Sequence, residues 1–231
     1  MPSPKPNSLK VDRSAKTLRE LTLEKMRDAI FSEHFKPGER LVERDLCAQL
    51  DVSRSVVREV LRHLETEGLV ESGQQQGPVV ASLDADRAAQ IYEIRALLEG
   101  QAARLCAEKA SDAAIGQLAK LNDRIQAAFK AEDFREVLAR TTAFYEAMFS
   151  AAGLAVAWDI VQSLNARINR LRSMTISSSG RSAEAAEEMA CIVKALRARD
   201  PQAAQEASQA HVRRVAQIAA LRLSGTGTQT R

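Results

Sequence analysis

Cysteine, histidine and aromatic residues are scarce in this sequence of 231 residues, and each scarcity excludes a class of protein. The three cysteines, Cys47, Cys106 and Cys191, lie far apart in the chain, which excludes a disulfide framework and a clustered zinc site. We expect all three to be reduced and packed between helices. Aromatic residues make up only 4% of the chain and alanine is abundant, which favours close-packed helices over a sheet sandwich.

Long apolar runs are also missing. No segment of about eighteen apolar residues occurs, and the first ten residues, MPSPKPNSLK, lack the apolar core of a signal peptide. We therefore expect a cytoplasmic protein without a membrane partner. Because the sequence has no Cys/His pair, carboxylate-rich pocket, glycine-rich phosphate loop or nucleophile elbow, it does not predict an enzyme.

An excess of charge is absent as well. The formal net charge is only +3, and basic and acidic residues roughly balance between residues 1 and 83. Binding of nucleic acid therefore has to depend on cations placed on one face of the protein. Hydrophobic residues make up 45% of the chain, enough to form a packed core.

The first part of the chain has the order of elements of a winged helix. Residues 1–14 are rich in Pro, Ser and Lys, which predicts a disordered arm. Apolar residues then recur at helical spacing over 16–34, and a second helix is predicted over 43–50, after the break at Pro37 and Gly38. Ser53 is a typical N-cap for a third helix that ends at Gly68. Two short strands, 69–71 and 79–81, complete a domain predicted over 15–83.

The third predicted helix carries arginines on one side. Arg54, Arg58 and Arg62 are four residues apart, so they share one face. Beside them runs an aliphatic stripe that can be buried, formed by Val57, Val60, Leu61 and Leu64. Guanidinium groups match both guanine edges and phosphate oxygens, and Ser53 and Ser55 can bind phosphate at the helix N-terminus. The alternative is a solvated helix face, but the neighbouring helices and hairpin favour DNA binding.

After residue 83 the sequence is helical throughout. Helices are predicted over 84–109, 111–130, 132–151, 154–174, 182–199 and 201–222, with breaks such as Asp200-Pro201, an N-cap followed by proline. A basic run from Asn165 to Arg172 is interpreted as a solvated face. We therefore predict a mainly α protein: a winged helix-turn-helix, then an all-α antiparallel bundle of about six helices over 84–223, and a disordered tail over 224–231.

The first domain resembles the winged helix of the GntR superfamily. The resemblance is carried by residues 37–41 (PGERL), 43–46 (ERDL), 52–61 (VSRSVVREVL) and 67–70 (EGLV). It implies that Arg44 in the second helix and Arg54 and Arg58 in the third contact the operator. It also implies that the wing tip, Gln76 and Gly77, enters the minor groove. Members of this superfamily read palindromic double-stranded DNA as homodimers, so we expect the same here.

The second domain resembles the FCD effector domain of the FadR-like branch, through residues 91–103 and 195–212. Many members hold a divalent metal there with one Asp and three His. Alignment on Phe144 puts Thr141, Tyr145 and Met189 at three of these positions, and only His211 remains. A hydroxyl, a phenol and a thioether do not replace a carboxylate and two imidazoles as ligands. We therefore expect no metal and no other cofactor.

The resemblance implies a cavity lined by Arg95, Thr141, Tyr145, Met189 and His211. An arginine, a phenol and an imidazole beside an apolar wall suit a small carboxylate. The alternatives are that Tyr145 and Met189 fill the space as core and that Arg95 pairs with Glu99, four residues on.

We expect a transcription regulator that acts as a repressor. Its operator affinity is expected to be controlled by a small metabolite, a carboxylate, which binds in the C-terminal helical bundle without a metal. The alternative is a ligand-independent DNA-binding regulator whose cavity is filled by side chains.

Overall fold

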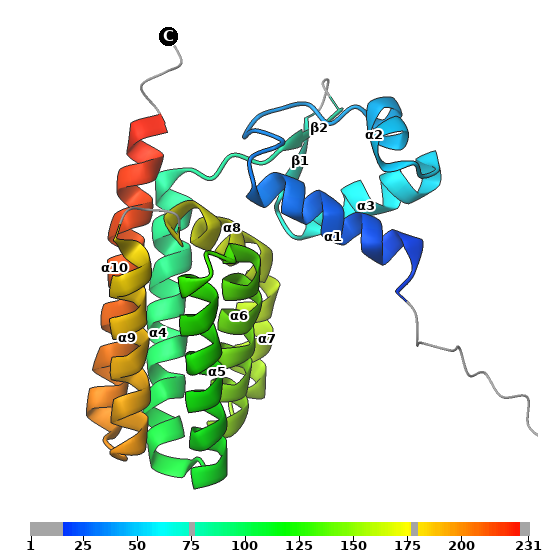
Figure 1. The fold of residues 1–231 in the computed structure, drawn as a ribbon. Helices are drawn as coiled ribbons and strands as arrows, with labels where there is room; N and C mark the ends of the chain where they lie inside the picture. The colour runs from blue at the N-terminus through cyan, green and yellow to red at the C-terminus, as the bar shows by residue number, and fades with distance from the viewer. Residues whose placement is uncertain (1–15, 74–76, 177–179, 227–231) are drawn as a thin grey trace, which may run out of the picture.

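The computed structural model describes residues 16–73, 77–176 and 180–226. This part of the chain contains ten helices and one two-stranded sheet. A small N-terminal domain with the sheet lies beside one end of a long helical bundle (Figure 1). The predicted fold class, a winged helix followed by an all-α domain, is confirmed. The predicted arm, residues 1–14, lies outside the described residues.

Three short helices form the N-terminal domain: α1 (Leu18–Phe31), α2 (Glu43–Leu50) and α3 (Arg54–Thr66). The Thr17 hydroxyl accepts a hydrogen bond from the Glu20 amide at 3.2 Å and so starts α1. The predicted cap Ser53 starts α3 in the same way, accepting from the Val56 amide at 3.4 Å. The aliphatic stripe of α3 is buried, with exposed fractions of at most 6% at Val57, Val60, Leu61 and Leu64.

An antiparallel hairpin follows α3. Strands β1 (Val70–Gly73) and β2 (Gly77–Val80) pair from Val70 opposite Val80 to Gly73 opposite Gly77. The predicted hairpin is present, but β1 begins one residue later and β2 two residues earlier than expected. The chain before α2 extends the sheet, because the Leu41 amide donates to the Pro78 carbonyl at 2.8 Å and Arg40 bridges to Val79.

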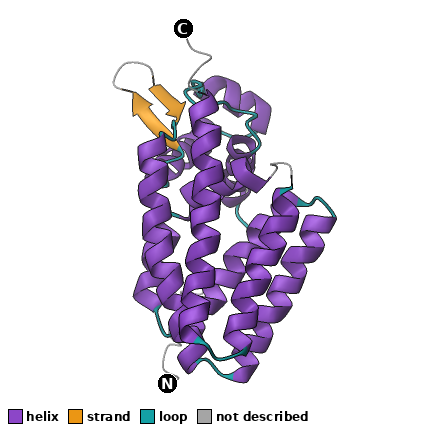
Figure 2. Cartoon of the chain, turned by 90° about the vertical axis from the view of Figure 1, so that its left-hand side faces the viewer, coloured by secondary structure: helices purple, strands orange, loops and turns teal. Residues whose placement is uncertain are grey.

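Seven helices form the described part of the second domain, where six were predicted. They are α4 (Ala85–Lys109), α5 (Asp112–Lys130), α6 (Phe134–Ala151), α7 (Ala155–Ser163), α8 (Asn165–Ile176), α9 (Arg181–Arg197) and α10 (Pro201–Thr226). Figure 2 shows the long helices running side by side, with the sheet near one end of the bundle. α4 packs most extensively against α10, and both contribute to one apolar core.

Two helix predictions are wrong in their bounds. The predicted helix over 154–174 breaks at Leu164, because the Ser163 hydroxyl donates to the Ile160 carbonyl at 2.7 Å. That carbonyl would otherwise accept from the Leu164 amide, which bonds instead to Val161, at 3.1 Å. The tail predicted from residue 224 is helical through Thr226, and the Ser224 hydroxyl bonds to the Ala220 carbonyl at 2.8 Å. Residues 227–231 lie outside the described part.

The described helices include none that is long and apolar enough to cross a membrane. The three cysteines are free thiols, but their surroundings differ. Cys106 is buried in the bundle and Cys47 is half-buried, as expected for packing residues. Cys191 is exposed, so the expectation that all three pack between helices is wrong for this residue.

Candidate DNA-binding surface and effector pocket

The arginine face of α3 lies in solvent, beside α2. Arg54, Arg58 and Arg62 are all exposed, while the stripe next to them holds the helix to its domain. The Nε group of Arg58 donates to both carboxylate oxygens of Glu43 in α2, at 2.9 and 3.1 Å. This ion pair ties the two helices together, yet 60% of the Arg58 side chain remains exposed. The two Nη groups of Arg58 donate to no other described residue, so they remain able to bind an acceptor.

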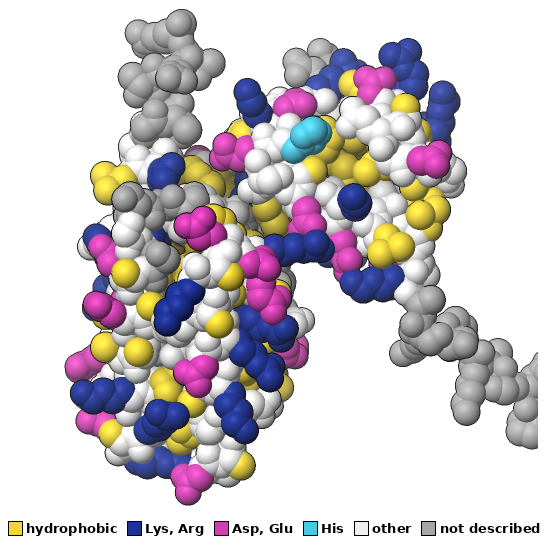
Figure 3. Space-filling view, viewed as in Figure 1, with side chains coloured by type: hydrophobic (Ala, Val, Ile, Leu, Met, Phe, Trp, Pro, Cys, Tyr) yellow, Lys and Arg dark blue, Asp and Glu magenta, His cyan; other side chains and the backbone are white. Residues whose placement is uncertain are grey.

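The remaining predicted contacts on α2 and at the start of α3 are also exposed. Arg44 is 82% exposed, and its ion-pair partner among the described residues is its neighbour Asp45, at 3.2 Å. The Ser53 and Ser55 hydroxyls lie 2.8 Å apart at the exposed N-terminus of α3, where backbone N–H groups favour an anion. In Figure 3, basic side chains project from the edge of the domain formed by α2 and the wing.

The wing brings one further cation to this surface. Gly77 has a φ of +73°, a conformation that other residues rarely adopt. A side chain there would meet the guanidinium of exposed Arg40, with Nε and Nη2 both 4.0 Å from the Cβ position. Sequence reasoning missed Arg40, although its place in the PGERL run before α2 was a usable signal. The other predicted wing residue, Gln76, lies outside the described residues.

A pocket of about 50 Å³ lies inside the bundle, large enough for a few water molecules. Four of the predicted effector residues line it: Arg95, Thr141, Met189 and His211. Tyr145 is buried in the core instead, and its ring packs against Arg172, with the Arg172 Cζ atom 5.3 Å from the ring centre. The position of Tyr145 is therefore that of a core residue, the alternative given in the sequence analysis, rather than that of a residue lining the pocket.

Arg95 forms a buried ion pair on α4. Its Nε donates to Glu99 Oε1 at 2.7 Å and its Nη2 to Glu99 Oε2 at 3.3 Å, with side-chain exposures of 1% and 0%. Burial lowers the pKa of Arg95, but the attraction of Glu99 more than offsets this and raises it above the ordinary value. Arg95 Nη1 is buried and has no hydrogen-bond partner within the described chain. The ion pair between Arg95 and Glu99, which the sequence analysis gave as an alternative, is thus present. It leaves Arg95 Nη1 without an acceptor among the described residues.

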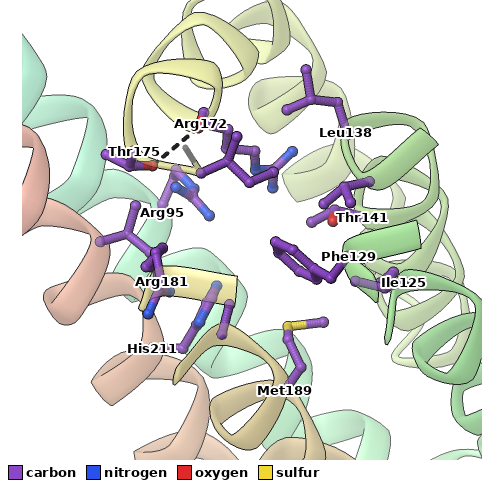
Figure 4. A pocket seen from close by; sticks show the side chains of 14 residues that line it. Arg95, Ile125, Phe129, Leu138, Thr141, Arg172, Thr175, Arg181, Met189 and His211 are labelled. Carbon is purple, nitrogen blue, oxygen red and sulfur yellow. Dashed lines mark hydrogen bonds between the residues drawn. The ribbon is translucent and has the colours of Figure 1, made fainter. Parts of the chain in front are cut away.

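Two cations of the pocket were missed by sequence reasoning, Arg172 on α8 and Arg181 on α9. The only hydrogen bond of Arg172 to a described residue is from Nη1 to Asn169 Oδ1, at 3.1 Å on its own helix. Burial, together with repulsion from Arg95, lowers the pKa of Arg172 to about 10. Figure 4 shows Arg172 and Arg95 converging on the pocket from neighbouring helices. The earlier interpretation of the run from Asn165 to Arg172 as a solvated face is therefore wrong at Arg172.

A third arginine, Arg181, lies on the same side of the pocket as Arg95, in a network with His211 (Figure 4). Arg181 is 4% exposed and donates through Nη1 and Nη2 to the two carboxylate oxygens of Glu188, both at 2.7 Å. Glu188 Oε2 also lies 2.6 Å from His211 Nδ1. Burial raises the pKa of Glu188, but its bonds to His211 and Arg181 outweigh burial and lower it to about 2. Burial lowers the pKa of His211, although the hydrogen bond and the attraction of Glu188 oppose this shift.

These residues do not fit the metal site of many FCD domains. Thr141 and Met189 offer only a hydroxyl and a thioether, which do not replace carboxylate and imidazole ligands. Among the described residues, no three His, Cys, Asp or Glu side chains lie together as a metal site would need. The donor set is instead rich in guanidinium groups, which bind anions.

α8 connects this pocket to the N-terminal domain. Its last part lines the pocket through Arg172, Thr175 and Ile176, while its first part packs on the winged helix through Ala166. Buried Arg170 donates through Nη1 to the carbonyl of Ala81, directly after β2. The expected solvated face is therefore wrong at Arg170 too, because the side chain reaches a domain that is distant in sequence.

The α8 contact also explains a glycine at the end of α3. Gly68 has a φ of +68°, and a Cβ at this position would lie 2.1 Å from Arg167 Nη2. Only a residue without a side chain lets the Arg167 guanidinium lie against the turn that follows α3. The turn after α3 and the residue after β2 are thus both in contact with α8.

Comparison with known proteins agrees with this architecture. Residues 18–80 match the bacterial regulatory proteins described as the gntR family, and residues 90–214 match the FCD domain. The Nta operon transcriptional regulator of Aminobacter aminovorans is 44% identical over 87 residues, which cover 38% of this chain and 41% of that protein. The HTH-type transcriptional repressor RspR of Escherichia coli is 24% identical over 181 residues, covering 78% of this chain and 79% of that protein.

A solved structure shares the fold. The crystal structure of a putative GntR transcriptional regulator from Rhodococcus sp. RHA1 has a TM-score of 0.71 at 24% identity, covering 87% of this chain and 96% of that one. The chain therefore belongs to the GntR family of bacterial transcription regulators and combines the DNA-binding domain of that family with an FCD domain.

Proposed function

We propose that this regulator is a homodimeric repressor that binds a palindromic operator, and that a small carboxylate in the bundle pocket controls its operator affinity. The observation that carries the proposal is the position of α8, which lines the pocket at one end and packs on the winged helix at the other. A ligand that binds two arrangements of α8 unequally shifts the orientation of the winged helix. The repressor function named for the RspR relative supports the direction of control.

DNA contact is assigned to one exposed surface. We propose that Arg58 reads base edges, because its guanidinium is held by Glu43 on one edge and open on the other. Arg54 and Arg62 flank it, Arg44 reaches from α2, and Ser53 and Ser55 bind phosphate at the start of α3. Gly77 and Gln76 of the wing are proposed to enter the minor groove.

The first experiment selects binding sites for the full chain from random double-stranded DNA. A two-fold symmetric site is the expected result, together with a solution mass of twice 25.3 kDa by light scattering. Arg58→Ala should then weaken binding to the selected site by about 1–3 kcal/mol, roughly tenfold or more. Arg124→Ala, an exposed arginine on α5 of the bundle, is the matched control and should bind as wild type. Equal binding by Arg58→Ala and Arg54→Ala would show that α3 is not the reader.

The proposed effector site comprises Arg95, Thr141, Met189 and His211, with Tyr145 behind them. Calorimetry of the unfolding transition separates ligand control from the alternative of a filled, ligand-independent pocket. A ligand at one hundred times its Kd stabilises the folded chain by about 2.7 kcal/mol. A bound carboxylate should also change the affinity for the selected DNA site. If no small carboxylate changes either the stability of the folded chain or its affinity for the selected DNA site, the alternative of a ligand-independent regulator holds.

A further inference from the structure

A second and larger cavity lies between the two domains. This interdomain cleft has a volume of about 830 Å³ and is bordered by the end of α1 in the winged helix and by α6 and α8 of the bundle. Asp28 and Phe31 of α1 and the turn as far as His34 form its winged-helix wall. An ion pair between Arg135 of α6 and Asp28, at 3.2 Å, joins the two sides. Because α1 packs on α8, the cleft lies directly beside a helix that also lines the bundle pocket (Figure 1).

The bundle pocket and the interdomain cleft share a wall. Leu138 of α6 and Ile176 of α8 line both cavities. Figure 4 shows Leu138 at the rim of the pocket, next to Thr141, which lies about one helical turn further along α6. Two apolar side chains therefore stand between the cleft and the groups that face the pocket.

The pocket wall is also least buried on this side. Most of the residues that line the pocket are buried, and the half-buried ones are Leu138, Thr141, Arg172 and Ile176. All four belong to α6 and α8, whereas the pocket residues of α4, α5, α9 and α10 are buried. A ligand that reaches the pocket while the bundle stays folded therefore passes between α6 and α8.

Of the two shared side chains, Leu138 is held less firmly. Ile176 packs against the apolar core of the bundle, whereas Leu138 is not among the described residues that do so. Ile176 is also β-branched, which restricts its first side-chain torsion. A half-exposed leucine outside the core can change rotamer quickly without disturbing the packing around it. Leu138 is therefore the side chain that can open the shared wall.

We propose that the effector enters the bundle pocket from the interdomain cleft, and that the side chain of Leu138 is the gate between them. The inference rests on the proposed effector pocket and adds the route by which that pocket is filled. α1 forms the outer wall of this route, so the effector passes between the bundle and the DNA-binding domain.

The test measures access to the pocket with a thiol reagent and needs no effector. Thr141→Cys places a thiol on the pocket wall, in a side chain of similar size. The full chain is treated with methyl methanethiosulfonate, and mass spectrometry of the digested protein separates the introduced thiol from the three natural cysteines. Leu138→Ala, combined with Thr141→Cys, should raise the reaction rate about tenfold or more, because a gate that opens in about 0.1–10% of molecules is then absent. Leu138→Trp should lower the rate, because a larger side chain makes the open state rarer.

Global unfolding also exposes the introduced thiol, so a second leucine serves as the matched control. Leu118 on α5 is 0% exposed and lines neither cavity. Leu118→Ala should lower the melting temperature more than Leu138→Ala does, because it removes a fully buried side chain. It should nevertheless leave the reaction rate of the introduced thiol unchanged.

Three results would overturn the inference. If Leu138→Ala and Leu138→Trp both leave the rate unchanged, the reagent does not pass Leu138. If Leu118→Ala raises the rate as much as Leu138→Ala, the thiol reacts through unfolding. A thiol that reacts in none of these variants would equally contradict a route past Leu138. The proposed carboxylate effector is judged separately, by unfolding calorimetry and DNA affinity, so its failure is distinguishable from failure of the entry route.

Discussion

Glu99→Gln is the substitution that most directly probes the charge balance of the pocket. Glu99 is 0% exposed and Arg95 is 1% exposed, one helical turn apart on α4. The substitution keeps the shape of the side chain but removes its charge, which leaves the buried guanidinium of Arg95 without its carboxylate partner. Loss of one partner of a buried ion pair destabilises a protein by about 3–5 kcal/mol, because the other charge stays buried. We expect a loss of this size for Glu99→Gln.

Urea unfolding at pH 7, followed by circular dichroism, measures this loss as a change in midpoint at constant slope. The double variant Arg95→Met with Glu99→Gln is the control, because it removes both charges and leaves no unpaired ion at this position. It should recover most of the stability, since apolar replacement of a buried pair is often neutral. A small carboxylate bound as proposed should stabilise Glu99→Gln more than it stabilises wild type, because its charge then replaces the missing one. A loss below about 1 kcal/mol, or no recovery in the double variant, would refute the proposed role of the pair.

Four further results are expected. If Arg58 also contacts a phosphate, Arg58→Ala should reduce the steepness of the plot of log K for binding the selected DNA against log salt concentration by about 1. An unchanged slope would mean that Arg58 contacts only bases. Arg170→Ala should destabilise the chain by about 1–3 kcal/mol in urea, because the Ala81 carbonyl loses a buried charged donor; unchanged stability would exclude this link between the domains. Glu188 has its pKa lowered from 4.5 to about 2, so it stabilises the fold above its ordinary pKa, and this contribution is lost as the pH falls from about 5 to about 2. Glu188→Gln should therefore flatten the pH dependence of urea unfolding in that window, and an unaltered profile would contradict the assignment. The affinity for a small carboxylate effector should be unaffected by EDTA, and a loss on chelation would show that a metal takes part.

Local sequence signals predicted the N-terminal domain well. The Ser53 cap, the aliphatic stripe of α3 and the glycine after it each act within a few residues, so their physical effects can be read from the order of the chain. Strand bounds were less accurate, because the pairing of Arg40 with Val79 depends on chain segments that are far apart. The side of α3 that faces solvent followed from the phase of the helix alone.

The pocket was predicted only in part. Thr141, Met189 and His211 were found through the resemblance, since the family places ligands at those positions. Arg172 and Arg170 were missed because a basic run on a helix is usually solvated, and nothing local distinguishes an arginine that reaches another domain. The break at Leu164, which turns α8 toward the winged helix, depends on one hydroxyl of Ser163 that competes for a backbone carbonyl. Such a competition is decided by the packing around it.

The missing metal ligands and the unpaired arginine answer the same physical requirement. A carboxylate buried among apolar side chains needs a cation beside it, since an unpaired buried charge is strongly unfavourable. Where an FCD domain holds a divalent metal, that ion supplies the charge, and its affinity depends on deprotonated imidazole and carboxylate ligands. In this chain Thr141 and Met189 cannot hold such an ion, and Arg172 supplies a charge that stays fixed at every physiological pH. Because this charge is carried by α8, an anion bound as proposed would contact the same helix that packs against Gly68 and Ala81.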